Sequence, residues 1–358
     1  MDIREKAAEL KEKLAEHCAA MSAKARYGII GAVCAFIVLA AAAAYMFAAG
    51  TTSGHGSNIA VEIKPGTATS EIAAELEHKG IVNSALGFRL MAQLSGRDRD
   101  FHEGLYYFRS GMRPSAVISQ IAAGPEDSVV RVTVPEGYTV DDIGRLLEAK
   151  ELVTKDDFTA AAKDFAPYDY MKEALEHKDI KYAAEGFLFP DTYDFDRSYS
   201  AEDIMGIMAD NFDRKLTAEM RSQAQARGLS IFQLVTMASL VEKEAKFAED
   251  RPIIADVFYK RLKEDMPLQS DATIQYALDE HREEFSIEDT KIDSPYNTYQ
   301  HQGLTPGPIG NPGLASIEAA LNPSHTDYMY FVADKEGHNH YSVTYDEHQQ
   351  AIDEVYGE

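Results

Sequence analysis

The chain has 358 residues, of which 59 are acidic and 35 are basic, and its formal net charge is −24. Its length allows two or three folded units, and its hydrophobic content of 45% is typical of a globular protein. The acidic balance excludes nucleic acid as an expected partner, because nucleic-acid binding needs a basic surface. Both cysteines, Cys18 and Cys34, precede residue 50, so the rest of the chain uses no disulfide framework.

An uncharged stretch runs from Tyr27 to Gly50, and Lys24 and Arg26 stand directly before it. About 20 apolar residues in a helix cross a bilayer. The basic residues on the N-terminal side place that side in the cytoplasm. We therefore predict a cytoplasmic segment over 1–26 and a single transmembrane helix over 27–49, with the remainder of the chain outside.

A cleaved signal peptide is the alternative for this stretch, because its alanine-rich end suits a cleavage site. The preceding residues are long and mixed in charge for the start of a signal peptide, which favours an uncleaved anchor. Residues 50–58 are polar and rich in glycine and serine, and they predict a linker that spans at most about 30 Å. The folded part would then begin close to the outer face of the membrane.

A sequence repeat follows the linker, with copies that begin at Val61 and Val132. Each copy predicts a strand, a glycine turn and a helix with apolar residues four apart. The matched pairs are Gly66 and Gly137, Ile72 and Ile143, Leu76 and Leu147, and Val82 and Val153. With a strand in "GLYYFRSGM" and a helix that ends at Gly124, the repeat predicts an α+β subdomain over 59–155. It resembles the LysM-like module of wall-binding proteins, and a compact spacer is the alternative.

A second domain is predicted over 156–358, and its first clear element is one long helix that ends at Gly228. Ser230 and Gln233 have the spacing of a capping box, so another helix begins there. A helix over about 251–264, a helix from Ser270 or Asp271, a helix in "ASIEAALNP", a hairpin around Glu336–Gly337 and a final helix follow.

Two glutamates stand near the end of the helix in "LVTMASLVEKEA". At about 100° per residue, Leu234, Met237 and Val241 form one apolar stripe. Glu244 lies about 20° from Met237 in projection, whereas Glu242 lies about 140° away. A carboxyl in apolar surroundings has a raised pKa and can act as a general acid. The alternative is that Glu244 lies where the stripe meets solvent at the helix end.

The segment "SPYNTYQHQGLTPGPIGNPG", over 294–313, has too many prolines and glycines for a helix or a central strand. Tyrosine faces stack on sugars, and amide side chains pair with hydroxyl and acetamido groups. The segment therefore predicts a sugar-binding loop, with a purely structural connection as the alternative.

The C-terminal histidines invite comparison with a metal site, which would use His338, His340, His348, Asp334 and Asp346. The spacing matches no metal motif, so a hairpin edge with solvated histidines is favoured and no metal is predicted. The sequence has no glycine-rich phosphate loop and no GxSxG elbow. We therefore predict neither a cofactor nor a nucleophilic side chain.

Seven stretches occur in an order that resembles the endolytic murein transglycosylases of the MltG/YceG-like family. They are "EGFLFPDTYDF", "LVTMASLVEKEA", "ADVFYKRL", "MPLQSDATIQYAL", "YNTYQHQGLTPGPIGNPG", "ASIEAALNP" and "YMYFVADKEGHNHY". The resemblance covers about residues 59–352. One departure is Thr305, where the family often has proline, and it affects the expected geometry of the loop.

The resemblance implies a single-pass protein of the bacterial inner membrane, with a LysM-like α+β subdomain followed by a mixed α/β catalytic domain outside the cytoplasm. It implies a lyase that cuts nascent peptidoglycan strands internally and forms 1,6-anhydro-MurNAc ends. It also suggests proximity to penicillin-binding proteins of the elongation machinery. In this family a single glutamate serves as acid and then as base, and the matching position is Glu244.

The expected substrate-binding residues are Gln269, Ser270, Asp271, Thr273, Tyr296, Asn297, Thr298 and Asp191. Two other functions remain open from the sequence. One is a peptidoglycan-binding scaffold without catalysis, which would bind glycan and leave strand length unchanged. The other is an inverting muramidase with Asp191 as the base for water, which would produce reducing ends.

Overall fold

The computed structural model describes Tyr27 and residues 31–35, 54–125, 129–278, 286 and 288–357. The predicted cytoplasmic segment over 1–26 and most of the predicted transmembrane helix over 27–49 lie outside the described residues. Among the helices that are described, none has the length and apolar character needed to cross a membrane. The predicted linker over 50–58 is partly a strand, because the first strand already begins at His55.

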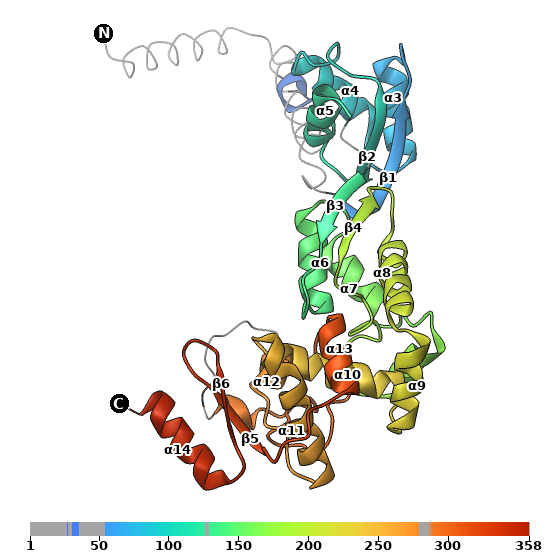
Figure 1. Ribbon diagram of the computed structural model, residues 1–358. Coiled ribbons are helices and arrows are strands. Elements are labelled where there is room, and N and C mark those ends of the chain that lie inside the picture. Colours follow the sequence, from blue (N-terminus) through green and yellow to red (C-terminus); the bar gives the residue numbers. More distant parts are fainter. Residues whose placement is uncertain are drawn as a thin grey trace, which may run out of the picture. The chain divides into compact units, whose positions relative to one another are not determined.

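The chain divides into two compact units, residues 1–55 with 59–126, and residues 56–58 with 127–358. In the first unit, two antiparallel strands and three helices follow one another as strand, helix, helix, strand, helix (Figure 1). They are β1 (His55–Ile63), α3 (Thr69–His78), α4 (Ala85–Leu94), β2 (Gly104–Ser110) and α5 (Pro114–Ala123). The strand in "GLYYFRSGM" and the helix that ends before Gly124 are both confirmed.

The second unit begins with the same order of elements. They are β3 (Val129–Thr133), α6 (Val140–Ala149), α7 (Lys155–Ala162), β4 (Thr192–Asp196) and α8 (Ala201–Lys215). Strands β3 and β4 pair antiparallel, as β1 and β2 do. The repeat seen in the sequence is thus a repeated strand–helix–helix–strand–helix motif. The contact division falls at residue 126, whereas the predicted boundary at 155 would cut through the second copy.

The rest of the second unit surrounds α10 (Ile231–Glu244), which contacts α9 (Ala218–Ala226), α11 (Arg251–Lys263), α12 (Asp271–Leu278) and α13 (Leu314–Leu321) (Figure 1). Short 3-10 turns occur at Asp169–Glu176, Ala248–Asp250 and Asp289–Lys291. The chain ends with the predicted hairpin and helix, β5 (Tyr330–Ala333), β6 (Asn339–Ser342) and α14 (Tyr345–Tyr356).

The prediction of one long helix ending at Gly228 is wrong, because the structure has α8 and α9 in its place. Leu216 leaves the helical conformation, and the Thr217 side chain accepts a hydrogen bond from the Met220 N–H at 3.2 Å. This N-cap gives the new helix a partner for one of its free N–H groups, so a break at Thr217 is stabilised.

Helix α10 begins with the predicted capping box between Ser230 and Gln233. The predicted stripe residues Leu234, Met237 and Val241 are all fully buried. The burial extends to the other faces of the helix as well, since every residue from Leu234 to Val241 is buried. Helix α10 is therefore a central helix rather than an amphipathic surface helix.

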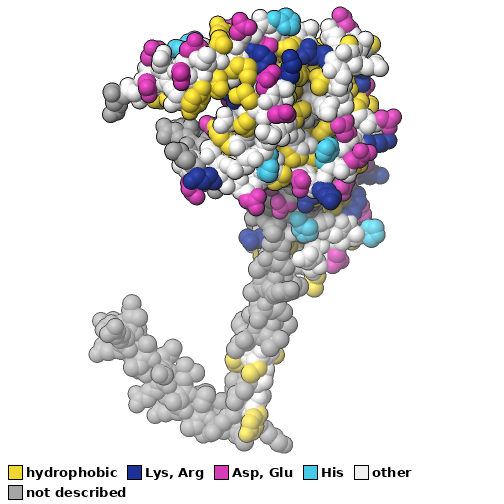
Figure 2. Space-filling model, turned by 90° about the horizontal axis from the view of Figure 1, so that it is seen from below, with side chains coloured by type: hydrophobic (Ala, Val, Ile, Leu, Met, Phe, Trp, Pro, Cys, Tyr) yellow, Lys and Arg dark blue, Asp and Glu magenta, His cyan; other side chains and the backbone are white. Residues whose placement is uncertain are grey.

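Charged side chains of both signs are mixed on one face of the molecule. Figure 2 shows acidic and basic side chains interspersed with apolar ones over the face seen from below Figure 1. On this face the acidic excess of the chain is thus dispersed.

Candidate active site

Helix α10 ends in Glu242, Lys243 and Glu244, and their side chains point toward different segments of the protein. Glu242 accepts hydrogen bonds from the Gly313 N–H at 3.1 Å and from the Ser316 hydroxyl at 2.7 Å. Both donors stand at the start of α13, where a helix has free N–H groups and favours a negative charge. Glu242 is therefore a structural residue that joins α10 to α13.

Glu244 points to a different neighbour, the segment that begins α12. Its carboxylate accepts a hydrogen bond from the Ser270 hydroxyl and another from the Ala272 N–H. Burial raises the pKa of the Glu244 carboxyl, and the nearby Asp271 raises it further, although the bond from Ser270 opposes the shift. Measured over the whole residue, Glu244 is only partly buried, so the raised carboxyl pKa occurs in a residue that solvent can reach.

The segment at Ser270 is held in place by two buried threonines. Gln269 adopts a left-handed conformation with φ of 51°, and its N–H donates to the Thr298 carbonyl at 3.2 Å. The Ser270 N–H donates to the Thr298 hydroxyl at 3.0 Å, and that hydroxyl lies 3.0 Å from the hydroxyl of Thr273. Thr273 also donates to the Ser270 carbonyl at 2.6 Å. These contacts fix the position of the hydroxyl that meets Glu244.

Tyr296 and Asn297 of the "YNTY" stretch lie inside the protein. Asn297 is fully buried, and its amide donates to the carbonyls of Thr290 at 3.1 Å and Ile292 at 2.8 Å. The ring of Tyr296 packs 4.9 Å from that of Tyr276. Tyr299 donates to Asp271 at 2.6 Å, so this loop also orients the acidic residue beside Ser270.

The predicted substrate-binding residues therefore separate into three groups. Gln269 and Asp271 are exposed beside Glu244. Five side chains are buried and hold this segment and its loop, namely Ser270, Thr273, Tyr296, Asn297 and Thr298. Asp191 belongs to neither group, because its contacts lie elsewhere.

Asp191 lies at the start of β4 and is bound there by the second repeat. It accepts hydrogen bonds from the Thr192 N–H at 2.8 Å and from the Asn211 amide at 3.0 Å. These bonds lower the pKa of the Asp191 carboxyl, and Lys215 at 3.9 Å adds to the effect. None of these partners, all of them described residues, contacts Glu244, so the two carboxyls share no hydrogen-bond partner.

A second buried carboxyl was missed from the sequence, although it opens the quoted stretch "EGFLFPDTYDF". Glu185 is 2% exposed and accepts hydrogen bonds from the Val140 N–H at 3.1 Å, the Tyr276 hydroxyl at 3.2 Å and the Asn311 amide at 3.2 Å. Burial raises the pKa of Glu185 to about 8. The carboxyl is enclosed, so it serves as a junction of three segments rather than as a reacting group.

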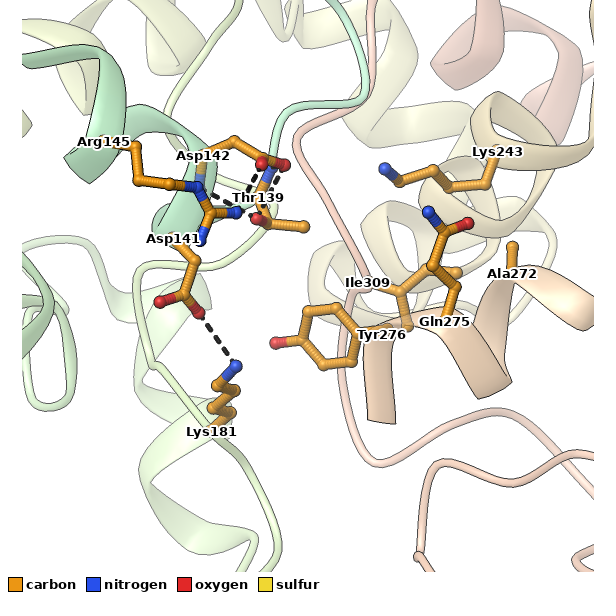
Figure 3. A pocket seen from close by; sticks show the side chains of 10 residues that line it. All are labelled: Thr139, Asp141, Asp142, Arg145, Lys181, Lys243, Ala272, Gln275, Tyr276 and Ile309. Atoms are coloured by element: carbon orange, nitrogen blue, oxygen red, sulfur yellow. Dashed lines mark hydrogen bonds and ion pairs between the residues drawn. The ribbon is translucent and has the colours of Figure 1, made fainter. Parts of the chain in front are cut away.

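A pocket of about 50 Å³ is lined in part by Lys243 and Ala272 (Figure 3). The second repeat lines one wall, with Thr139, Asp141, Asp142 and Arg145, and Lys181 lies on the same side. The facing residues are Lys243, Ala272, Gln275, Tyr276 and Ile309. Ala272 connects the pocket to the site, because its N–H donates to the Glu244 carboxylate. The wall is ordered by ion pairs of Asp141 with Lys181 at 2.8 Å and of Asp142 with Arg145 at 2.7 Å.

The C-terminal histidines take part in local contacts of the hairpin. His338 stacks on Phe247 with ring centroids 4.3 Å apart, and His340 lies 3.4 Å from the Asp334 carboxylate. Among the residues that the structure describes, no group of three or more His, Cys, Asp or Glu side chains could hold a metal ion.

Comparisons with known proteins agree on one family. The model of the YceG-like family matches residues 61–354. The endolytic murein transglycosylase of Bacillus subtilis is 36% identical over 304 residues, which are 82% of this chain and 84% of that protein. The endolytic murein transglycosylase of Streptococcus pneumoniae is 35% identical over 321 residues, and the match covers 83% of this chain and 58% of that longer protein. The crystal structure of a YceG-like protein from Listeria monocytogenes aligns with a TM-score of 0.58 at 35% identity, over 83% of this chain and 99% of that one.

Proposed function

The chain belongs to the YceG-like family, and from this premise we propose that it is an endolytic murein transglycosylase. It is a lyase that acts on peptidoglycan, outside the cytoplasm. The observation that carries the proposal for the site is Glu244, a partly buried residue whose carboxyl has a raised pKa and accepts a hydrogen bond from Ser270.

The reaction needs one proton-transferring group. Glu244 begins protonated and gives its proton to the glycosidic oxygen between MurNAc and GlcNAc, so the bond to that oxygen breaks. The C6 hydroxyl of the same MurNAc attacks C1, and the Glu244 carboxylate takes the hydroxyl proton. The products are a free GlcNAc hydroxyl and a 1,6-anhydro-MurNAc end, and Glu244 is protonated again.

A second carboxyl is unnecessary for this reaction, because the nucleophile belongs to the substrate and is present at a high effective concentration. Hydrolases that invert configuration need another carboxylate for water, placed on the opposite side of the sugar. The hydrogen bonds that Asp191 accepts from Thr192 and Asn211 are local to the second repeat and give no support to a hydrolytic role.

The roles of the other site residues follow from their exposure. Gln269 and Asp271 are exposed beside Glu244, and we propose that they contact the glycan. We assign a positioning role to the buried Ser270 and Thr298, since a shift of either would move the hydrogen bond to Glu244. Thr305 is buried and donates to the Gly307 carbonyl at 2.8 Å, a bond that supports the loop where the family often has proline.

The location of the enzyme is also part of the proposal. The uncharged stretch over 27–49, with Lys24 and Arg26 before it, supports a single-pass anchor with a cytoplasmic N-terminus. An enzyme anchored in this way would cut nascent strands close to the membrane, beside penicillin-binding proteins. The LysM-like subdomain predicted over 59–155 would give it a second contact with glycan.

The test is mass spectrometry of glycan products after the full chain acts on nascent, lipid-linked peptidoglycan. The wild type is expected to produce 1,6-anhydro-MurNAc ends. Glu244→Gln should lower the rate by roughly 10²- to 10⁴-fold, because it removes the acid and base of the reaction. Glu264→Gln, an exposed glutamate at the end of α11, is the matched control and should keep the wild-type rate.

Two outcomes would contradict the proposal. If Glu244→Gln cut peptidoglycan as fast as the wild type, Glu244 would have no catalytic role. If the wild type produced reducing ends instead of anhydro ends, the enzyme would be a hydrolase.

A further inference from the structure

Lys243 stands between Glu242 and Glu244, and its side chain runs along two loops of the second unit. A Cβ added to Gly310 would lie 3.1 Å from Cε of Lys243, and one added to Gly137 would lie 3.9 Å from its Cδ. The two loops are joined by the Gly137 N–H, which donates to the Asn311 carbonyl at 2.8 Å. The lysine stem therefore packs against fixed backbone, and this packing directs its ammonium group.

The ammonium group points into the pocket beside Glu244 (Figure 3). The other two cations of the pocket have partners already, since Lys181 pairs with Asp141 and Arg145 pairs with Asp142. Within the described part of the chain, the Lys243 ammonium makes neither an ion pair nor a hydrogen bond. The lining thus holds three cations against two carboxylates. The buried Glu185 carboxyl attracts Lys243 through space but forms no ion pair with it, so the ammonium still has room for a ligand.

Two residues connect the pocket to the proposed reaction centre. Ala272 lines the pocket and also donates its N–H to Glu244, and Lys243 directly precedes Glu244 in α10. A glycan strand with its scissile bond at Glu244 would therefore place a substituent of the adjacent sugar at this opening. A lysine ammonium forms its strongest hydrogen bonds with ionised acceptors such as carboxylates.

We propose that this pocket binds a carboxylate of the peptide that murein carries on its muramic acid, and that Lys243 determines this specificity. The inference rests on the proposed function, because it assigns the occupant of a subsite beside Glu244. The sugar backbone of the strand is uncharged, so a cation in this position selects for strands whose peptides still carry free carboxylates.

The experiment compares two versions of one nascent peptidoglycan, with free peptide carboxylates and with the same carboxylates converted to amides. The quantity measured is the ratio of kcat/KM for the free form to kcat/KM for the amidated form, with the full chain. The wild type is expected to prefer the free form by about tenfold, as for one charge-assisted hydrogen bond. Lys243→Met keeps most of the packed stem and removes the ammonium, so the ratio should fall close to one.

Two further variants complete the design. Lys243→Arg keeps the positive charge and should retain a clear preference for the free form. Lys263→Met changes an exposed lysine at the end of α11 and should keep the wild-type ratio. A binding measurement on the Glu244→Gln protein, with uncut strands of both forms, should show the same preference in Kd.

The outcomes separate the inference from the proposed function. An active wild type with a ratio near one, or a Lys243→Met variant that keeps the wild-type ratio, would overturn the subsite while leaving the transglycosylase intact. A wild type that cuts neither form would overturn the proposed function, and the subsite would fail with it. A loss of rate in Lys243→Met that is equal on both forms also contradicts the inference, because a general structural defect does not depend on substrate charge.

Discussion

The two copies of the repeated motif share a core and differ in what their turns contact. Val61 and Val132, Ile72 and Ile143, and Leu76 and Leu147 are all buried at matching positions. The turn glycines also match in backbone conformation, with φ of 77° at Gly66 and 75° at Gly137. A non-glycine residue is strained at such angles, so the turn depends on glycine in both copies.

Among the described residues, the turn of the first copy bonds within its own unit. The Thr67 N–H and hydroxyl both donate to the Lys64 carbonyl, and the Thr69 hydroxyl donates to the Asp98 carbonyl at 3.3 Å. An added Cβ at Gly66 would meet nothing described within 4 Å. In the second copy the Asn311 N–H donates to the Tyr138 carbonyl at 2.9 Å, and the Val140 N–H donates to Glu185. The pocket residues Asp141 and Arg145 occupy the positions of Ser70 and Ala74 in the first copy.

The comparison shows that the fold of the motif and the contacts that the motif makes with other segments are determined by different residues. The motif is specified by a few buried residues and one glycine, which both copies retain. The second copy contacts the rest of its unit through residues at its turn and in the first turn of α6. Four experiments can break or sharpen this comparison.

The largest expected effect is at Asn311, the residue that joins the second copy to the rest of its unit. Its side chain accepts from the Leu188 N–H at 2.8 Å and donates to Tyr138 at 2.8 Å and to Glu185. Leucine is similar in size to asparagine, but Asn311→Leu leaves these buried groups unpaired. The free energy of unfolding, measured with urea, should therefore fall by roughly 3–5 kcal/mol. Asn322→Leu, at an exposed asparagine, should change stability by less than about 0.5 kcal/mol. Equal effects in both variants would show that the junction adds no stability.

The next effect concerns Glu185, a contact that the second copy alone makes through Val140. The pKa of Glu185 is raised to about 8, above its unfolded value, so its contribution to stability is complete below the unfolded pKa and is lost as pH rises through about 8. Between about pH 5 and 8, the stability of the wild type should fall by up to about 1.4 kcal/mol per pH unit from this group. Glu185→Gln should lack that part of the slope, as measured by urea unfolding at several pH values. Identical slopes would mean that Glu185 titrates normally.

A smaller effect tests the feature that both copies share. Gly66→Ala and Gly137→Ala should each lower the free energy of unfolding by about 1 kcal/mol, because alanine is strained at positive φ. The added methyl at Gly137 would lie 3.5 Å from Cγ of Glu242, an ordinary contact, so the two losses should agree within about 0.5 kcal/mol. A much larger loss of unfolding free energy in Gly137→Ala would show that the turn of the second copy cannot shift to accept the methyl group.

The smallest effect is expected at Arg145, which pairs with Asp142 while half of its side chain remains exposed. Surface ion pairs contribute little, so Arg145→Ala should change the free energy of unfolding by less than about 0.5 kcal/mol. It would give the second copy the residue that the first copy has at Ala74. A loss above about 1.5 kcal/mol would assign Arg145 a structural role that the ion pair does not explain.

The features that could be predicted from the sequence are those set by neighbouring residues. The capping box of Ser230 and Gln233 and the separation of Glu244 from Glu242 follow from helical periodicity alone. The repeat could be predicted for the same reason, because the spacing of apolar residues in each copy indicates one strand and one helix. The break at Thr217 was missed because the apolar pattern continues across it, although threonine is a good N-cap.

The features that could not be predicted depend on partners far apart in the chain. Glu185 is a junction only because its donors come from Val140, Tyr276 and Asn311. Thr273 and Thr298 were predicted at the site, but their burial beneath Ser270 depends on how two loops meet. The spacing of residues in the sequence does not indicate which loops contact each other. The structure was therefore needed to distinguish side chains that face the substrate from those that support them.

The three charged residues at the end of α10 also constrain how this protein can change over evolutionary time. Glu242, Lys243 and Glu244 contact different parts of the protein because each side chain leaves the helix at a different angle. Inserting or deleting one residue in α10 would rotate all three by about 100° and misdirect them together. Substitutions can test these positions one at a time, but a change in length alters them all. We therefore expect relatives to vary in the loops around α10 and to keep the number of residues between Ser230 and Glu244.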